Sequence, residues 1–290
     1  LDDFQIKGCY AIESGKGVLV AAPTGAGKTI VGEFAAYLAT EQGKKCFYTT
    51  PIKALSNQKY QEFIDRFGEE RVGLLTGDNS INSEADIMVM TTEVLRNMLY
   101  TNSSTLLNLG YVVMDEVHYL ADKFRGAVWE EVLIHLMESV QVVSLSATVS
   151  NAEEFGDWLQ AVRGDTEVIV SESRPVPLYQ HVLIGNKLLD LFNEDGSVNQ
   201  ALFRSERGAL RRLRTPRNRG RGDDENRLDR PEGIEKLQFN QMLPVITFIF
   251  SRQGCDSAVK QCLAANLRLT STIERDEIRE TALKYTATIN

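Results

Sequence analysis

One eight-residue stretch of the sequence combines the residue types that bind a phosphate group: Ala22, Pro23, Thr24, Gly25, Ala26, Gly27, Lys28 and Thr29. Its glycines allow backbone N–H groups to curl around a phosphate and approach it closely. Lys28 can reach the β- and γ-phosphates of a nucleotide, and the hydroxyl of Thr29 can ligate Mg²⁺. The stretch therefore predicts a nucleoside-triphosphate site, although Ala22 stands where the usual pattern begins with glycine.

A pair of acidic residues, Asp115 and Glu116, closes an apolar run at 111–114. Asp115 can hold Mg²⁺ directly or through water, and Glu116 can polarise the water that attacks the γ-phosphate. An acid after a strand would also serve as a helix N-cap. The pair follows Lys28 by 87 residues (115 − 28) in one predicted sheet. We therefore predict Lys28, Asp115 and Glu116 as catalytic residues. The predicted magnesium ligands are Thr29, Asp115 and Glu116.

Three further polar residues, His118, Ser146 and Thr148, lie close to strand ends. Serine and threonine are common turn residues, and a lone histidine is more often structural than a metal ligand. In company with the two preceding motifs, these three residues are predicted to couple the nucleotide site to the rest of the protein.

The elements that must position these residues alternate between strands and helices. The phosphate-binding stretch follows an apolar run at 18–21 and precedes a helix over 30–39. Further strands are predicted at 44–50, 72–76, 86–90, 111–114, 141–145 and 168–170, and further helices at 4–12, 54–67, 92–100, 128–137 and 153–159. This alternation predicts an α/β fold with a parallel sheet and helices on both faces. The polar residues that follow the strands then share one edge of the sheet, where ligands bind.

The alternation is lost after about residue 182 and resumes with an apolar run at 244–250, predicted to be a strand, and a helix at 251–264. We therefore divide the chain into an ATP-binding domain, a linker or insertion, and the start of a second, incomplete domain: residues 1–180, 181–242 and 243–290. Within the linker, residues 204–230 carry ten arginines against five acids, a net charge of +5 (10 − 5). We interpret this segment as mobile and solvated, with nucleic-acid contact as the alternative.

The composition is that of a soluble globular protein, with 43% hydrophobic and 25% charged residues among 290. No apolar run reaches the ~18 residues of a membrane span and no secretory signal is visible, so we expect a cytoplasmic protein without a membrane partner. The net charge of −8 excludes a general polycation but not a local basic groove. The four cysteines form no C-x-x-C pair, so neither zinc nor disulfides are indicated. Because the sequence starts without methionine, we expect a piece of a longer protein.

The motifs APTGAGKT, TTPIKALSNQKY, GLLTGD, TTEVLR, DEVH and LSAT occur in this order between residues 22 and 148. They resemble motifs I, Ia, Ib, Ic, II and III of superfamily 2 DExH-box helicases. The forms TPIKAL, RGAVWEE and SLSAT resemble the superkiller-like branch, and FYTT and FIFSR its bacterial HelY-type members. The resemblance covers nearly the whole chain. It implies a RecA-like P-loop NTPase domain, followed by the beginning of a second RecA-like domain.

The resemblance also implies cofactors and further site residues. The cofactors are ATP and Mg²⁺, and Gln5 matches the family's residue that reads the edge of adenine. The residues that match motifs holding the backbone of one nucleic-acid strand are Pro51, Lys53, Gly77, Asp78, Thr91, Thr92 and Arg96. Hydroxyls, backbone N–H groups and an occasional cation suit phosphate contacts that do not read sequence. Thr91 or Thr92 followed by Glu93 would equally begin a helix.

The implied function is an ATP-dependent helicase that moves along single-stranded nucleic acid, with RNA favoured over DNA. The resemblance also implies a monomeric motor that works with RNA-decay machinery. We expect the chain alone to bind nucleotide but to hydrolyse it poorly. The reason is that arginines from a second lobe, of a kind worth about 10³–10⁵ in rate, are absent from it.

Three alternatives stay open. A DNA helicase in repair would use the same phosphate contacts, because the 2′-OH contacts that discriminate RNA cannot be recognised in the sequence. A P-loop phosphotransferase acting on a small molecule would have no use for the motifs at 50–55 and 91–96. A non-catalytic scaffold is opposed by the intact Lys28, Asp115 and Glu116.

Overall fold

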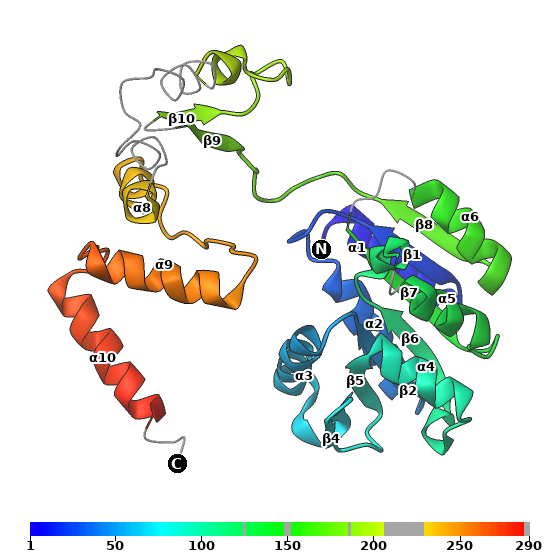
Figure 1. The fold of residues 1–290 in the computed structure, drawn as a ribbon. Helices are drawn as coiled ribbons and strands as arrows, with labels where there is room; N and C mark the ends of the chain where they lie inside the picture. Colours follow the sequence, from blue (N-terminus) through cyan, green and yellow to red (C-terminus); the bar gives the residue numbers. More distant parts are fainter. Residues whose placement is uncertain (124–125, 148–151, 185–186, 206–228, 287–290) are drawn as a thin grey trace. The chain divides into compact units, whose positions relative to one another are not determined.

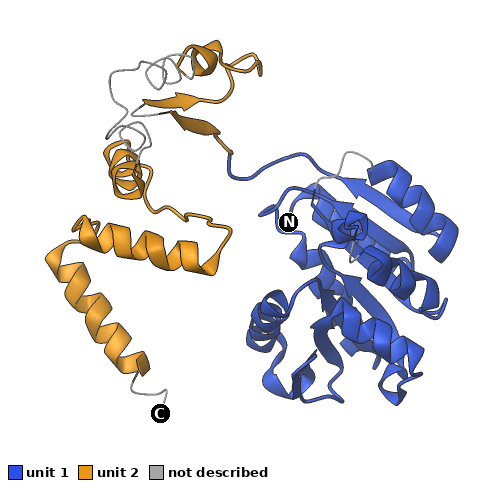
Figure 2. Ribbon diagram, viewed as in Figure 1, with its two compact units in different colours: residues 1–177 blue, residues 178–290 orange. Residues whose placement is uncertain are grey.

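The computed structural model of the chain describes residues 1–123, 126–147, 152–184, 187–205 and 229–286. The chain divides into two compact units, Leu1–Pro177 and Leu178–Asn290 (Figure 2). Thr148 and residues 206–228 of the arginine-rich segment lie outside the described residues, and the mobility of 204–230 stays a prediction. The division of the chain into three parts at residues 180 and 242 stays a prediction.

Unit 1 is built on a sheet that has eight strands within the described part of the chain (Figure 1). Their bounds are β1 (Gly17–Ala21), β2 (Lys45–Thr50), β3 (Val72–Thr76), β4 (Asn79–Ile81), β5 (Ile87–Thr91), β6 (Leu109–Met114), β7 (Gln141–Ser146) and β8 (Thr166–Val170). Across the sheet the order is β4-β3-β5-β2-β6-β7-β1-β8. All neighbouring pairs are parallel except β3 and β4. The carboxyl ends of the parallel strands therefore meet at one edge.

Helices cover both faces of this sheet. One face carries α1 (Asp3–Glu13), α2 (Thr29–Glu41) and α3 (Lys53–Phe67), and the other carries α4 (Thr92–Tyr100), α5 (Gly126–His135) and α6 (Ala152–Arg163). Short 3₁₀ turns lie at Glu69–Arg71, Ser104–Leu106 and Val117–Ala121. Among the described helices, none has the length and apolar content that crossing a bilayer requires.

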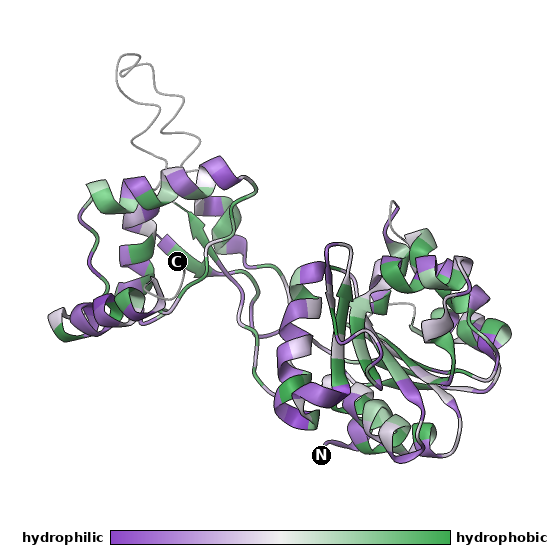
Figure 3. Cartoon of the chain, turned by 90° about the horizontal axis from the view of Figure 1, so that it is seen from below, coloured by the Kyte–Doolittle hydropathy of each residue, from purple (hydrophilic) through white to green (hydrophobic). Residues whose placement is uncertain are grey.

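The sheet separates two apolar cores, because successive side chains of a strand point to opposite faces. In β1, Val18 and Val20 pack in the core under α1, α2 and α3, whereas Leu19 packs in the core under α4, α5 and α6. The strands of unit 1 are accordingly coloured as hydrophobic along most of their length in Figure 3, while the helices show hydrophilic bands. Such continuous apolar strands are typical of parallel sheets buried on both faces. The predicted RecA-like sheet with helices on both faces is confirmed.

Unit 2 contains an antiparallel hairpin, β9 (His181–Ile184) and β10 (Lys187–Asp190). It also contains the helices α8 (Arg230–Phe239), α9 (Arg252–Ala264) and α10 (Thr272–Thr286). The predicted helix at 251–264 is confirmed as α9. The hydroxyl of Ser251 caps this helix by accepting a hydrogen bond from the backbone N–H of Gly254 at 2.9 Å.

The predicted strand at 244–250 is wrong. These residues form neither a helix nor a strand, and Phe248 and Phe250 are exposed. A buried parallel strand needs neighbouring strands to satisfy its backbone, but in the described part of unit 2 the two named strands pair with each other. The apolar composition of the segment gives it a high strand propensity, but this propensity does not form a strand without a neighbouring strand to pair with.

Arg163, the last residue of α6, ties the chain that follows α5 to the rest of unit 1. Its guanidinium donates hydrogen bonds to the carbonyl groups of Leu136, Met137 and Val140 at 2.7, 2.8 and 2.9 Å. These carbonyls lie at and beyond the end of a helix, where no intrahelical donor reaches them. The planar guanidinium has several N–H donors in fixed directions, so it can donate hydrogen bonds to all three carbonyl groups at the same time.

We predict that Arg163→Lys lowers the free energy of unfolding of unit 1 by about 1–3 kcal/mol, because an ammonium group cannot reach all of these carbonyls. Urea unfolding followed by circular dichroism measures the change. The matched control is Arg66→Lys, because the Arg66 side chain is 56% exposed and pairs, within the described residues, with a single group, the carboxylate of Glu33; pairs at the surface are worth about 0–1 kcal/mol. Equal losses in the two variants would contradict the role given to Arg163.

Candidate nucleotide and nucleic-acid site

The phosphate-binding loop connects β1 to α2 at the carboxyl edge of the sheet. Gly25 and Gly27 have φ angles of 82° and 86°, which lie in the left-handed region that favours glycine. Ala22 is buried, so its methyl group is accommodated where the usual motif has glycine. The N-terminus of α2 carries the positive end of the helix dipole. This combination suits an anion.

Lys28 is folded back onto the loop. Its Nζ donates hydrogen bonds to the carbonyl oxygens of Ala22 at 2.8 Å and Pro23 at 3.2 Å. Burial lowers the pKa of Lys28, and the charges of Glu116 and Asp115 act in the opposite direction. In the described sheet only β7 lies between β1 and β6, so the loops that carry the predicted lysine and the predicted acids emerge close together at one edge.

Gln5, on α1, is buried against the same loop. Its Nε2 donates to the carbonyl oxygens of Gly27 at 3.1 Å and Ala26 at 3.4 Å, and its Oε1 accepts from the backbone N–H of Asp2 at 2.8 Å. A Cβ atom at Gly27 would lie 2.6 Å from this Nε2. The amide of Gln5 therefore holds the loop in place, and its contact with adenine stays a prediction.

Asp115 and Glu116 directly follow β6. The backbone N–H of Asp115 donates to the carbonyl of Thr49 at 3.0 Å, so the pairing of β6 with β2 continues into the acid pair. Glu116 has a φ angle of 53°, a left-handed conformation that is costly for a residue with a side chain. Burial raises the pKa of both carboxyl groups, and the charge of Asp115 raises that of Glu116 further. Strain and raised pKa values at one place are typical of a functional site.

The oxygen donors at this edge fit a magnesium ion. Mg²⁺ prefers hydroxyl, carboxylate and water oxygens. Lys59 connects the three predicted ligands, because its Nζ lies 3.3 Å from Thr29 Oγ1 and its charge lowers the pKa of both Asp115 and Glu116. Lys59 therefore donates to one predicted magnesium ligand, and its charge favours the ionised form of the other two.

Sequence reasoning missed two residues of this site, Tyr48 on β2 and Lys59 on α3. The buried hydroxyl of Tyr48 donates to Asp115 Oδ2 at 2.8 Å. Burial, followed by the nearby Asp115 charge, raises the pKa of Tyr48 well above its usual value. Both residues flank the motif at 50–55 whose resemblance suggested nucleic-acid contacts alone. No sequence signal identifies Tyr48, because its role depends on the pairing of β2 with β6, which places the ends of these strands side by side.

His118 lies between the acid pair and the end of β7. Its Nδ1 is 3.3 Å from Glu116 Oε2 and 3.4 Å from the backbone nitrogen of Ala147. Ser146 is buried, and its hydroxyl finds no hydrogen-bond partner within the described part of the chain. Thr148 lies outside the described residues. The coupling roles of His118, Ser146 and Thr148 stay predictions.

The other half of the same edge carries the residues expected to contact nucleic acid. They follow β2, β5 and β3, which are neighbours in the sheet. Lys53 and Asp78 are exposed and form an ion pair at 2.5 Å. Gly77 is exposed with open space around its Cα, and Arg96 is half-buried with its Nε 3.7 Å from Glu131 Oε2. Lys53, Asp78 and Gly77 therefore lie at the surface of this edge, and their contact with nucleic acid stays a prediction.

The remaining three predicted contacts, Pro51, Thr91 and Thr92, are buried. The hydroxyl of Thr92 donates to the carbonyl of Thr50 at 3.2 Å, and Thr91 is the N-cap residue of α4. The Thr92 side chain therefore fastens α4 to β2, and a contact with nucleic acid stays a prediction for all three residues.

The family model for the DEAD/DEAH box helicase matches residues 2–155. The chain belongs to this family. The matched region runs from α1 into α6 and contains both halves of the site.

Three relatives are similar over nearly the whole chain. Probable helicase HelY of Mycobacterium leprae (strain TN) is 58% identical, over 97% of this chain and 32% of that protein. The DExH-box ATP-dependent RNA helicase DExH15, chloroplastic, of Arabidopsis thaliana is 40% identical, over 98% and 28%. Superkiller complex protein 2 of Homo sapiens is 40% identical, over 96% and 23%. The chain thus spans a third or less of the length of these curated relatives. The predicted resemblance to HelY-type and superkiller-like helicases is confirmed.

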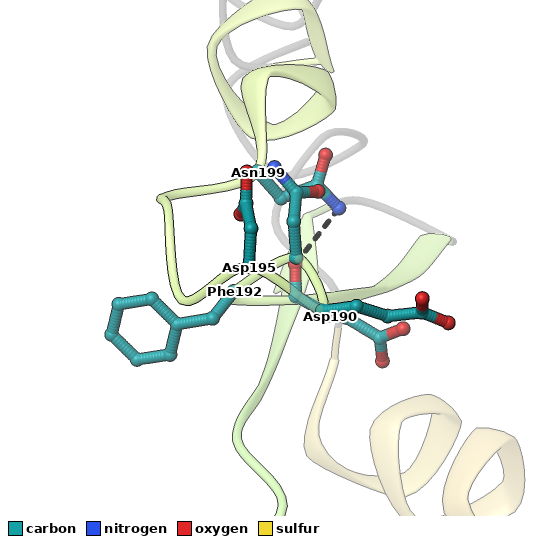
Figure 4. Close-up of a pocket in the computed structure, with 6 residues that line it drawn as sticks. Asp190, Phe192, Asp195 and Asn199 are labelled. Carbon is teal, nitrogen blue, oxygen red and sulfur yellow. Dashed lines mark hydrogen bonds between the residues drawn. The ribbon is translucent and has the colours of Figure 1, made fainter.

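A cavity of about 520 Å³ in unit 2 contains none of the DEAD/DEAH box motif residues (Figure 4). Its lining residues are Asp190, Phe192, Asn193, Glu194, Asp195 and Asn199. The carboxylate of Asp195 accepts hydrogen bonds from the N–H and the hydroxyl of Ser197, and Asn199 Nδ2 donates to the carbonyl of Asp190 at 3.0 Å. These polar groups serve the turn itself, which makes the cavity a poor candidate for the functional site.

We predict that Tyr48→Phe, which removes only the hydroxyl facing Asp115, weakens magnesium-dependent nucleotide binding by about ten-fold or more. The hydrogen bond from Tyr48 lowers the pKa of Asp115 against the effect of burial. Without it, the carboxyl group keeps its proton to a higher pH, so the defect should grow as the pH falls from about 7.5 to about 5.5.

Calorimetric titration with magnesium and ADP at several pH values tests this prediction. Tyr111→Phe is the matched control, because Tyr111 is a buried tyrosine of β6 whose hydroxyl donates to Gln42 at 3.0 Å. A Tyr48→Phe defect that is equal at all pH values, or shared by the control, would refute the role of the hydrogen bond.

Proposed function

We propose that the chain is the ATP-binding part of a helicase that uses ATP hydrolysis to move along single-stranded nucleic acid and separate duplexes. The observation that supports this proposal is the division of one sheet edge into two neighbouring halves. The half formed by β1, β7 and β6 carries Lys28 and Asp115, and the half formed by β2, β5 and β3 carries Lys53, Gly77 and Arg96. A small-molecule phosphotransferase would have no use for the second half.

Each residue of the nucleotide half has a proposed task. Lys28 exchanges the carbonyls of Ala22 and Pro23 for oxygens of the β- and γ-phosphates, while loop N–H groups donate to the same phosphates. Glu116 takes the proton of the attacking water, a task favoured by its raised pKa. Thr29 and Asp115 would hold Mg²⁺, which neutralises charge on the phosphates when it is bound.

Hydrogen bonds connect the two halves where β6 lies beside β2. Asp115 is tied to β2 twice, through its backbone N–H to Thr49 and through its carboxylate to Tyr48. The next residue of β2, Thr50, accepts the hydroxyl of Thr92 at the start of α4, the helix that carries Arg96. We propose that a change at the acid pair reaches the nucleic-acid half through β2 and α4.

RNA is the proposed substrate, because the similar Arabidopsis thaliana protein is described as an RNA helicase. From the superkiller-like resemblance we further propose a monomeric, cytoplasmic motor that serves RNA-decay machinery. A DNA helicase in repair is the second candidate, since the exposed groups at the edge suit the phosphates of either polymer. Unwinding of matched RNA and DNA duplexes by the natural protein separates the two, and a preference for DNA would overturn the RNA assignment.

We predict that Glu116→Gln leaves nucleotide affinity within about two-fold but slows hydrolysis by about 10²–10⁴, because the amide cannot accept the proton of water. Lys28→Ala should instead weaken nucleotide binding by about 10–100-fold through the loss of charged hydrogen bonds. Equilibrium binding of a fluorescent ADP measures the affinity of each variant of the natural protein. RNA-stimulated release of phosphate measures the rate of hydrolysis. Normal hydrolysis in Glu116→Gln would remove the role given to that carboxylate.

We predict that Lys53→Ala and Arg96→Ala each weaken binding of single-stranded RNA and reduce the slope of log affinity against log salt by about 0.7. Fluorescence anisotropy with a labelled homopolymer at several salt concentrations measures both quantities. Lys45→Ala is the control, because Lys45 begins β2 at the opposite end of the strand and pairs there with Glu84 at 3.3 Å. If the control changes the slope as much as the two variants do, the proposed nucleic-acid edge is wrong.

A further inference from the structure

Lys59 extends from α3 to the part of the nucleotide site that contains the predicted magnesium ligands Thr29, Asp115 and Glu116, which we call the metal side. Its Nζ donates to Thr29 Oγ1 at 3.3 Å and to Glu62 Oε2, one turn further along α3, at 2.5 Å. The side chain is 14% exposed, so this cation has left most of the solvent. A lysine that only formed an exposed pair within its helix would gain about 0.2–0.5 kcal/mol and would have no reason to lie against α2.

The groups around Lys59 are those assigned to magnesium. Thr29 Oγ1 is its direct partner, and the charge of Lys59 also acts on the carboxylates of Asp115 and Glu116. A lysine ammonium and a divalent cation repel each other at short range and seek the same oxygens. Both therefore cannot hold the Thr29 hydroxyl at the same time.

We propose that Lys59 is a positioning residue that occupies the metal side of the site until magnesium and nucleotide are loaded, and then pairs with Glu62 alone. This inference rests on the proposed function. Before loading, Lys59 neutralises the acid pair and orients Thr29. On loading, the ammonium leaves Thr29 and keeps the pair that it already makes with Glu62, so the helix itself contains the partner that the charge needs. Lys59 thus sets how much magnesium is required to load the site.

The same helix carries Lys53 in its first turn, six residues before Lys59 and about 9 Å away along the axis. Lys53 belongs to the nucleic-acid half of the edge, where it pairs with Asp78. The helix that loses its contact with Thr29 on loading is therefore also a helix that the proposed nucleic-acid strand touches.

The test is a magnesium titration of fluorescent-ADP binding to the 290-residue chain. Lys59→Met, which keeps the length of the side chain and removes its charge, should lower the half-saturating magnesium concentration by about three- to ten-fold. Glu62→Gln removes the partner that Lys59 keeps after loading and should raise the half-saturating magnesium concentration. If Glu62 acts through Lys59, the Glu62→Gln change should have no effect in a Lys59→Met background.

Lys45→Met is the matched control, because the Lys45 side chain has the same exposure of 14% and also pairs with a glutamate. It should leave the magnesium requirement unchanged. If the wild-type chain binds the nucleotide and Lys59→Met has an unchanged or increased half-saturating magnesium concentration, the inference is overturned. The proposed function then still stands. If the wild-type chain binds no nucleotide at any magnesium concentration, the proposed function and the inference fail together. Thermal melting of each variant establishes that it is folded.

Discussion

The parallel hydrogen-bond ladder of unit 1 is the constraint on which the rest of the site depends. Because β1, β7, β6, β2, β5 and β3 run in one direction, the loops that follow them emerge at one edge. Residues far apart in the sequence, such as Lys28 and Asp115, are brought to the same edge by strand pairing and need no direct contact with each other. The same ladder carries Asp115 onto the carbonyl of Thr49, so the acid pair inherits its position from backbone pairing.

Placing charged groups at that edge has an electrostatic cost. Lys28, Asp115 and Glu116 are all partly removed from water, and the pKa of each moves in the direction that disfavours its charge. The fold offsets this cost with fixed partners: carbonyls for Lys28, the hydroxyl of Tyr48 for Asp115 and the Lys59 ammonium nearby. Lys28 and Lys59 must exchange these partners when nucleotide and magnesium enter, so the contacts stabilise the charges of the empty site.

The sequence allows much of this arrangement to be predicted, because apolar runs and the glycine-rich loop are local signals. All seven predicted strands of unit 1 form, each within two residues of its expected bounds. Tyr48 and Lys59 could not be predicted in this way, since their roles depend on which strand lies beside β2 and on how α3 leans toward Thr29. The prediction of a strand at 244–250 is wrong because strand formation also depends on a partner. The apolar sequence favours a strand, but no described strand pairs with it.

That segment has a practical consequence for handling the chain. Ile246, Phe248 and Phe250 present large apolar side chains to water within five residues, and Phe239 lies exposed shortly before them. A solvent-facing aromatic run with strand propensity is a template for intermolecular β-pairing. Preparations of these 290 residues should therefore self-associate as protein concentration rises, and size-exclusion profiles recorded across a dilution series would reveal it before any assay is interpreted.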